Sequence, residues 1–250
     1  MKGIDDIILN KASHIKRAIV TPKPFEPYFK IYKAKSDKAV FLYHGWAQGV
    51  NPFIHVVQKL KKKYNVVLFY YPLKIICDEP KLTPIYFNKM LNLSKKAIKK
   101  LEKENVKEFY SFGVSLGTFL SIYIANKTKK LSKMVLSIGG ISFSDTFWDS
   151  ITFIKLKNKI TKNGYDLQKL KKEWNSIEPY NNLENVKNKK ILVYNSTTDM
   201  LVRFKYQDKL TKELQHNNIV TVKKYKVGHY FTGLKSVTDH KTYLRFYKND

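Results

Sequence analysis

The sequence predicts an α/β protein built on a mostly parallel, eight-stranded sheet with helices on both faces. Three observations predict it: short apolar runs recur along the chain, helical patterns alternate with them, and 250 residues suit one domain with a sizeable core. Continuous apolar runs such as Val66–Tyr70 are typical of strands buried on both faces of a parallel sheet. No repeat or Pro/Gly/Ser-rich linker marks a boundary, so we expect a single domain over residues 1–250.

The predicted strands follow in order along the chain. The first two, at 13–21 and 28–34, flank a proline-rich turn and would form an antiparallel edge of the sheet. The remaining six are expected at residues 39–43, 65–71, 108–112, 133–138, 190–194 and 219–226.

Helical patterns fill the intervals between these strands. One helix is expected to open at Thr83-Pro84, because proline suits the first turn of a helix. Its polar face carries lysines between positions 95 and 103, which we interpret as a solvated helix face. The segment from Leu116 to Ala125 is almost wholly apolar, which predicts a buried central helix. A final helix is expected to include Val237 and Tyr247.

The charge balance is strongly basic, with 47 Lys and Arg against 20 Asp and Glu and a net charge of +27. Only three of the basic residues are arginines, and the lysines are spread along the whole chain. Proteins that bind nucleic acid specifically favour arginine, because its planar guanidinium donates two parallel hydrogen bonds to a phosphate or a base. We therefore expect no specific nucleic-acid binding, but nonspecific attraction to anionic surfaces at low salt.

Signals for membrane insertion or secretion are missing from the sequence. No apolar stretch approaches the roughly 20 residues that span a bilayer, and residues 1–6 lack the apolar core of a secretory signal. The single cysteine, Cys77, excludes an intrachain disulfide. A cytoplasmic setting is the simplest interpretation.

The segment Gly113-Val114-Ser115-Leu116-Gly117 is the strongest chemical signal. A predicted strand enters it and a predicted helix leaves it, which is the context that a G-x-S-x-G nucleophile elbow requires. The tight turn would expose the Ser115 hydroxyl, while the glycines let strand and helix approach closely. Without this context the same pattern is an ordinary glycine-rich turn.

Two further candidates follow other predicted strands. Asp199 follows the strand at 190–194, and His229 follows the strand at 219–226. Ligands of open α/β sheets bind at the carboxyl ends of the strands, so these side chains are expected to meet Ser115. The chain order Ser115, Asp199, His229 is that of one class of catalytic triad and differs from the orders in chymotrypsin and subtilisin.

With these motifs and the loop His44-Gly45-Trp46, the chain resembles the α/β-hydrolase family, particularly its small esterases and monoacylglycerol-lipase-like members. The resemblance covers nearly the whole chain from about residue 13. It implies a serine hydrolase that cleaves a carboxylic ester of a small molecule through an acyl-enzyme, without a cofactor or a metal. Ser115 would be the nucleophile, His229 the base, and Asp199 the residue that orients the histidine.

The resemblance also implies an oxyanion hole and a cap. The backbone N–H groups of Trp46 and Leu116 would form the oxyanion hole. The cap is expected at residues 142–180, with amphipathic segments near 145–157 and 166–175. Its large apolar side chains would either roof an acyl pocket or pack the cap onto the sheet; they are Phe143, Phe147, Trp148, Ile151 and Phe153.

Several alternatives stay open on the sequence. Asp145 and Asp149 compete with Asp199 as the acid, and His44 competes with His229 as the base. The same triad would serve a thioesterase or a peptidase, because the substrate depends on the cap and the pocket walls. A catalytically inactive hydrolase fold that acts as a lysine-rich binding module is the third interpretation.

Overall fold

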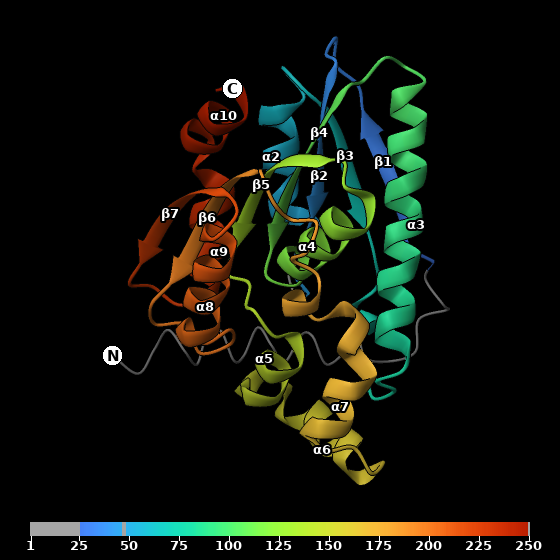
Figure 1. Ribbon diagram of the computed structural model, residues 1–250, viewed down its shortest axis with the longest axis vertical. Helices are drawn as coiled ribbons and strands as arrows, with labels where there is room; N and C mark the ends of the chain where they lie inside the picture. The colour runs from blue at the N-terminus through green and yellow to red at the C-terminus, as the bar shows by residue number, and fades with distance from the viewer. Residues whose placement is uncertain (1–25, 47–48, 250) are drawn as a thin grey trace.

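The computed structural model describes residues 26–46 and 49–249, and a seven-stranded sheet lies at its centre (Figure 1). The strands are β1 (Tyr28–Tyr32), β2 (Lys38–Tyr43), β3 (Asn65–Tyr70), β4 (Glu108–Val114), β5 (Leu131–Ser137), β6 (Lys190–Ser196) and β7 (Ile219–Tyr225). Their order is β1-β3-β2-β4-β5-β6-β7, and only β1 runs antiparallel to its neighbour among these strands. The sheet confirms the predicted α/β class. Seven strands are described rather than the eight predicted, and the strand predicted at 13–21 lies outside the described residues.

The position of each strand in the sheet explains its sequence pattern. β2, β3 and β6 lie between two neighbours and are buried almost throughout, so they carry unbroken apolar runs. β1 and β7 lie at the two edges, and their side chains are largely exposed or half-buried. The burial of each strand therefore matches its interior or edge position in the sheet.

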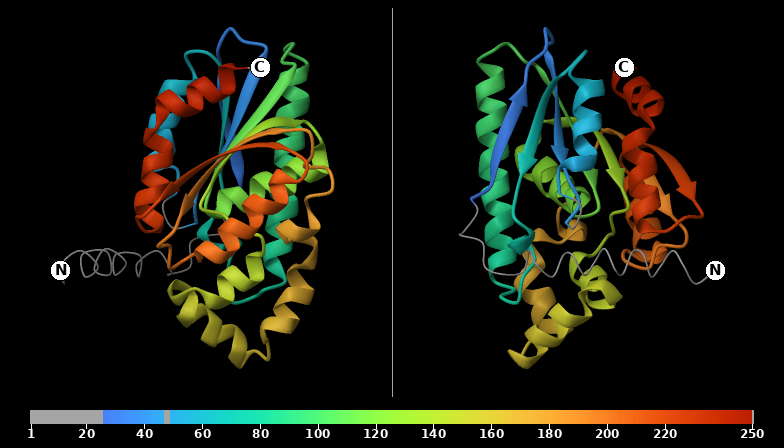
Figure 2. Two further views of the ribbon diagram at one scale, coloured as in Figure 1. Left: turned by 60° about the vertical axis from the view of Figure 1, so that its left-hand side comes forward. Right: turned by 180° about the vertical axis from the view of Figure 1, so that it is seen from behind.

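Helices cover both faces of the sheet (Figure 2). One face is covered by α2 (Asn51–Leu60), α9 (His229–Thr238) and α10 (His240–Lys248). The other is covered by α3 (Leu82–Glu102), α4 (Leu116–Thr128) and α8 (Phe204–Gln215). The predicted final helix is two helices in the structure, because the backbone of Asp239 leaves the helical conformation between α9 and α10.

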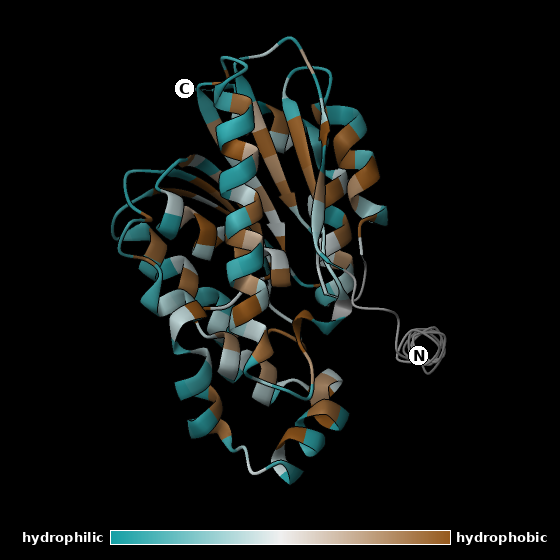
Figure 3. Ribbon diagram, turned by 90° about the vertical axis from the view of Figure 1, so that its right-hand side faces the viewer, coloured by the Kyte–Doolittle hydropathy of each residue, from teal (hydrophilic) through white to brown (hydrophobic). Residues whose placement is uncertain are grey.

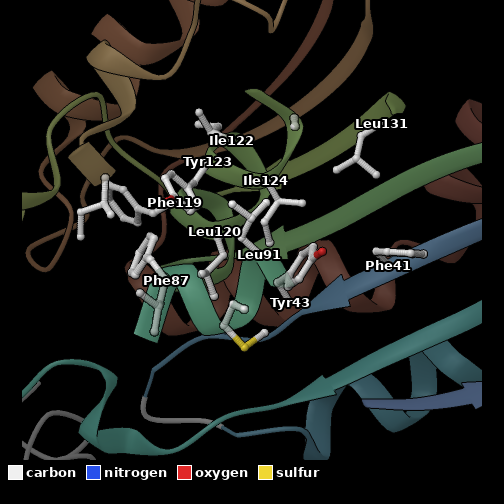
Figure 4. Packing of buried hydrophobic residues seen from close by; sticks show 14 of the residues in the cluster. Phe41, Tyr43, Phe87, Leu91, Phe119, Leu120, Ile122, Tyr123, Ile124 and Leu131 are labelled. Carbon is white, nitrogen blue, oxygen red and sulfur yellow. The ribbon is translucent and has the colours of Figure 1, made fainter. Parts of the chain in front are cut away.

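The larger part of the core lies between the sheet and helices α3 and α4. Phe41 and Tyr43 from β2 gather there with Phe87 from α3 and Leu120 from α4 (Figure 4). The Tyr43 hydroxyl is paired with the Ser94 hydroxyl at 2.9 Å, so this buried polar group is satisfied. α4 is buried nearly all round, as its apolar sequence predicts.

The outer face of α3 is polar, as predicted. Its lysines between positions 95 and 103 are exposed, while Ala97 and Ile98 are buried beneath them. Figure 3 shows this hydrophilic face of α3 in front of the hydrophobic strands. None of the helices in the described ranges is long and apolar enough to span a lipid bilayer.

The residues between β5 and β6 fold as short helices beyond the carboxyl ends of the strands (Figure 1). They form α5 (Phe143–Asp149), η3 (Ile151–Phe153), α6 (Ile154–Lys162), α7 (Leu167–Trp174), η4 (Asn175–Ile177) and η5 (Pro179–Asn181). We call residues 142–180 the inserted segment. The amphipathic stretch predicted at 145–157 is divided here, because Ser150 has an extended backbone that separates α5 from η3.

Candidate active site

Ser115 occupies the turn between β4 and α4 and has a strained backbone, with φ 53° and ψ −117°. A residue with a Cβ rarely adopts this region, and such strain is concentrated at functional sites. The Ser115 N–H donates to the Ser137 carbonyl at 2.8 Å, which fixes the turn to β5. The structure therefore confirms a sharp strand–turn–helix elbow at the predicted serine.

The two glycines of the motif allow close approach of neighbouring backbones. A Cβ on Gly117 would collide with the carbonyl oxygen of Tyr43, at the end of β2. A Cβ on Gly113 would collide with the carbonyl oxygen of Gly117. Only glycine therefore lets α4 begin directly against β2 and β4.

His229 is the first residue of α9 and lies between the two other predicted site residues. Its Nε2 is 3.0 Å from the Ser115 Oγ, and its Nδ1 is 2.7 Å from the Asp199 Oδ2. The imidazole is 8% exposed and the Asp199 side chain is fully buried. The structure thus brings together Ser115, His229 and Asp199 in one hydrogen-bonded chain, with the geometry of a nucleophile, a base and an orienting acid.

The Asp199 carboxylate is held by four hydrogen bonds. Oδ1 accepts from the backbone N–H groups of Leu201 and Val202, at 2.8 and 3.0 Å. Oδ2 accepts from His229 and from the Gln207 side-chain amide, the latter at 2.9 Å. The acid is therefore fixed in one orientation toward the imidazole.

The rival acids are paired with other side chains. Asp145 forms an ion pair with Lys171 at 2.8 Å. Asp149 accepts a hydrogen bond from the Tyr206 hydroxyl at 2.7 Å and pairs with Lys205 at 3.2 Å. Burial raises the pKa of Asp149, but these partners outweigh it, so the pKa lies below its ordinary value. Neither carboxylate contacts His229 among the interactions described.

The rival base, His44, has a different environment. Its ring stacks on Tyr71 with centroids 3.9 Å apart, and its Nδ1 is 2.8 Å from the Gly45 carbonyl oxygen. The Tyr71 hydroxyl donates in turn to the His44 carbonyl. Burial lowers the pKa of His44 to about 4, although the Gly45 carbonyl acts in the opposite direction. A neutral, packed ring of this kind shapes the loop after β2.

The other histidines of the described residues make no contact with Ser115 among the interactions found. His55 and His240 face one another with ring centroids 6.3 Å apart, and His216 lies next to Glu213 at 4.0 Å. His14 lies outside the described residues.

The two predicted oxyanion-hole residues both line the pocket that contains Ser115 and His229. Leu116 opens α4, where the first N–H groups of a helix have no partner within the helix. Trp46 follows Gly45, and a Cβ on Gly45 would lie only 3.5 Å from the Ser115 Cβ. The loop after β2 therefore passes beside the nucleophile candidate.

The pocket around Ser115 is small and mostly apolar, with a volume of about 50 Å³. Besides His229, it has no ionisable lining side chain except the Tyr230 phenol among the described residues. Burial and the nearby Asp199 charge raise the pKa of Tyr230, so this phenol stays protonated. The pocket is suited to an uncharged group.

The inserted segment supplies one wall of this pocket. Phe143 and Phe153 line it, and the Phe153 ring packs on Trp46 with centroids 5.1 Å apart. Phe147 is buried between Phe153 and Trp174, so it packs the segment rather than lining the pocket. The remaining predicted roof residues, Trp148 and Ile151, do not line the pocket.

Two buried polar residues near the site have no counterpart in the sequence predictions. Gln207 holds Asp199, and its Oε1 accepts the Ser196 N–H at 2.9 Å. Glu178 accepts from the N–H groups of Phe143 and Ser144 at 2.6 and 2.9 Å, at the start of α5. No local pattern reveals either role, because both depend on partners brought close by folding. Within the described ranges, no group of three or more His, Cys, Asp or Glu side chains could hold a metal ion.

The chain matches the model of the prolyl oligopeptidase family over residues 90–250. No curated protein matches it in sequence. Among solved structures, it is similar to a lipase-esterase related protein from Clostridium acetobutylicum, with a TM-score of 0.57 and 18% identity. That match covers 90% of this chain and 99% of the other.

Two further solved structures are similar in fold. An esterase from Exiguobacterium antarcticum gives a TM-score of 0.60 at 12% identity, covering 89% of this chain and 96% of its own. The acylaminoacyl peptidase of Pyrococcus horikoshii gives 0.66 at 13% identity, covering 94% of this chain but 43% of its own. The family model spans well over half of the chain, including Ser115, Asp199 and His229. The protein is therefore a serine hydrolase of the α/β-hydrolase fold that belongs to the prolyl oligopeptidase family.

Proposed function

We propose that the protein hydrolyses a carboxylic ester with a small, uncharged acyl group. The observation that carries the proposal is the hydrogen-bonded chain from Ser115 through His229 to Asp199, whose Ser115 and His229 line a mostly apolar pocket. Serine is a weak nucleophile at its own pKa and needs a base within hydrogen-bonding reach, which His229 provides.

In the acylation step, the Ser115 Oγ attacks the ester carbonyl carbon while His229 Nε2 accepts the serine proton. Asp199 accepts a hydrogen bond from His229 Nδ1–H, which fixes the tautomer of the ring, and it stabilises the imidazolium that forms. The N–H groups of Leu116 and Trp46 would stabilise the tetrahedral oxyanion. Loss of one such donor typically lowers turnover by about 10²–10³-fold.

The intermediate then collapses. The bond from the carbonyl carbon to the leaving oxygen breaks, and His229 returns its proton to the departing alcohol. Water enters, His229 takes one of its protons, and the hydroxide adds to the acyl carbon. In the collapse of this second intermediate the bond from the acyl carbon to the Ser115 Oγ breaks, and His229 returns its proton to Oγ, which releases the acid and restores the serine hydroxyl.

The pocket supports a short acyl chain. Its volume of about 50 Å³ is far below the roughly 300–1,000 Å³ of typical ligand pockets. The apolar side chains of Phe143, Phe153 and Ile138 would contact the acyl group. No ionisable side chain beyond His229 and Tyr230 lines the described pocket, which disfavours a substrate with a free charge next to the scissile bond.

A peptide or amide substrate is the second candidate, and the family match favours it. The same triad would cleave an amide if the leaving amine were protonated by His229. A thioester is attacked by the same chemistry.

A substrate panel tests the proposal. We expect p-nitrophenyl acetate and butyrate to give higher kcat/KM than the octanoate, short acyl-CoA thioesters or an N-acetylated aminoacyl p-nitroanilide. Ser115→Ala, checked for folding by circular dichroism, is expected to lose all of this activity. A highest kcat/KM on the anilide would establish the peptidase instead. Full activity of the folded Ser115→Ala protein would contradict both.

A further inference from the structure

Several residues that line the Ser115 pocket are next in sequence to exposed apolar side chains. Thr152 and Phe153 line the pocket and lie between the exposed residues Ile151 and Ile154. Leu201 and Tyr230 also line it, and Met200 and Phe231 beside them are exposed, as is Leu234 one turn further along α9. We call Ile151, Ile154, Met200, Phe231 and Leu234 the entrance surface.

These five side chains are each at least 50% exposed. Single exposed apolar residues are common on soluble proteins and need no explanation. However, ten large apolar side chains are exposed within the described residues, and half of them lie next to pocket-lining residues in the sequence or one helical turn from Tyr230 along α9. They come from three segments that are distant in sequence, so their grouping results from the fold. Grouped exposed apolar residues mark a surface that contacts a partner.

The segments that carry the entrance surface are strongly basic. Its three segments, 151–162, 200–206 and 226–235, contain eight Lys and Arg and no Asp or Glu. Asp78 pairs with Lys159 at 3.6 Å, and Asp149 is shared by Lys205 and Arg203. These acids from outside the segments neutralise only part of the excess.

Apolar side chains surrounded by lysines fit the interface of an anionic lipid layer. The apolar groups enter the boundary of the acyl chains, while the lysines remain among the charged headgroups. α6 is arranged in this way, with Ile154 at its exposed start and lysines at positions 155, 157, 159 and 162. An acidic protein partner would pair with the lysines, whereas an anionic lipid layer accommodates both the lysines and the apolar side chains.

From this grouping and charge, we infer that the entrance surface docks on an anionic lipid layer and that the ester enters the pocket from that layer. The inference rests on the proposed function for its substrate, since an ester that partitions into lipid would reach Ser115 without crossing water. The docking itself depends only on the entrance surface.

Vesicle co-sedimentation tests the docking at about 0.15 M salt, where weak long-range attraction is screened. The probe is phosphatidylcholine vesicles with or without about one third phosphatidylglycerol, and we expect binding to the anionic vesicles only. The double variant Ile151→Ser/Ile154→Ser is expected to bind about tenfold more weakly. Ile219→Ser is the control, because Ile219 is at least as exposed as Ile151 and Ile154 but begins β7 at the opposite end of the sheet.

A second pair of variants separates local charge from net charge. The triple variant Lys155→Gln/Lys162→Gln/Lys235→Gln removes lysine charges from the segments 151–162 and 226–235. It is expected to bind anionic vesicles at least about tenfold more weakly. Lys95→Gln/Lys96→Gln/Lys99→Gln makes the same charge change on the outer face of α3. It is expected to bind nearly as well as the unchanged protein.

Two results would overturn the inference: no binding to anionic vesicles, or equal losses in the entrance and control variants, which would indicate attraction by net charge alone. Hydrolysis of soluble p-nitrophenyl acetate is measured on every variant and is expected to stay unchanged. Vesicle binding without any hydrolysis would contradict the proposed function but leave the docking standing. Hydrolysis without vesicle binding would contradict the docking but leave the proposed function standing.

Discussion

At the residue scale, the site depends on how firmly Asp199 is held. Two backbone N–H groups, the Gln207 amide and His229 saturate its carboxylate. Such saturation stabilises the charged acid in a buried position, where an unpaired carboxylate would be costly. The orientation of the imidazole therefore depends on an acid that has no freedom to turn.

Asp199→Asn is expected to lower kcat by about 10³–10⁴-fold while the protein stays folded. The amide cannot hold the proton on Nδ1 of His229 and stabilise its positive charge, so the imidazole loses the correct tautomer. The measurement is steady-state hydrolysis of p-nitrophenyl acetate, with urea unfolding to verify the fold.

Asp149→Asn is the matched control, because Asp149 also lies near the site but pairs with Lys205 and Tyr206. We expect its kcat to change by less than about twofold. A large loss for Asp149→Asn, or none for Asp199→Asn, would reassign the acid.

The site residues at strand ends could be predicted from the sequence, whereas the buried residues that hold the site and the pocket wall in place could not. Ser115, Asp199 and His229 each follow a predicted strand, and a parallel sheet must bring such positions to one edge. Gln207 and Glu178 lie on a helix and in a turn, with no pattern around them. Their partners, Asp199 and the start of α5, lie elsewhere in the sequence and come close only in the folded chain.

At the element scale, Glu178 ties the inserted segment to the pocket. Its carboxyl group accepts the first N–H groups of α5, the helix that places Phe143 in the pocket wall. Glu178→Ala leaves these N–H groups buried without a partner, which is expected to cost about 1–3 kcal/mol of stability. Because α5 then loosens, KM should rise more than kcat falls. An unchanged KM with lowered stability would limit Glu178 to a structural role.

The stability contribution of Glu178 should also depend on pH. Burial raises its pKa above the ordinary value of 4.5, although the Ser144 hydroxyl and the N–H groups of Ser144 and Phe143 act against this. The folded protein then binds this proton more tightly than the unfolded chain. Its contribution is therefore present below about pH 4.5 and is lost as pH rises through the raised folded pKa.

Glu178→Gln isolates this effect, because glutamine does not titrate. Relative to the unchanged protein, this variant should gain stability as pH rises from 4.5 toward about 8. Urea unfolding of both proteins across this range measures the difference, in which the other titrating groups cancel. A constant difference, or one that favours glutamate at higher pH, would contradict the raised pKa.

Helix breaks were the least predictable elements. The stretch predicted at 145–157 is interrupted at Ser150, and the final helix is interrupted at Asp239. The Asp239 carboxylate accepts from Lys223 on β7 and from Tyr194 on β6, so contacts with the sheet hold this residue. Amphipathic patterns continue across both breaks, and hydrophobic periodicity alone does not reveal them.

At the scale of the whole molecule, the order of the strands positions the site, whereas the net charge affects the stability of the fold. The strand order β2-β4-β5-β6 places the ends of β2 and β4 next to one another and separates β4 from β6 only by β5, so the loop of Trp46, the elbow and the acid loop lie at the same edge. The net charge of +27 is spread along the chain, and the exposed face of α3 carries a dense group of lysines. Charge of one sign repels itself and destabilises the compact state.

The melting temperature should therefore rise by a few degrees between about 10 mM and about 150 mM NaCl, over which the Debye length falls from roughly 30 Å to 8 Å. Differential scanning fluorimetry measures this shift. Lys95→Gln/Lys96→Gln/Lys99→Gln should raise the melting temperature at low salt and reduce its dependence on salt. A melting temperature that is independent of salt would show that self-repulsion is negligible.

The central claim, that Ser115 is a nucleophile activated by His229, is tested most directly by labelling with a fluorophosphonate and locating the adduct by mass spectrometry. We predict one adduct on Ser115, none in Ser115→Ala, and labelling slowed by at least about 10³-fold in His229→Ala. His240→Ala serves as the control and should label normally. An unlabelled Ser115 in folded protein, or labelling that persists at full rate without His229, would contradict the claim.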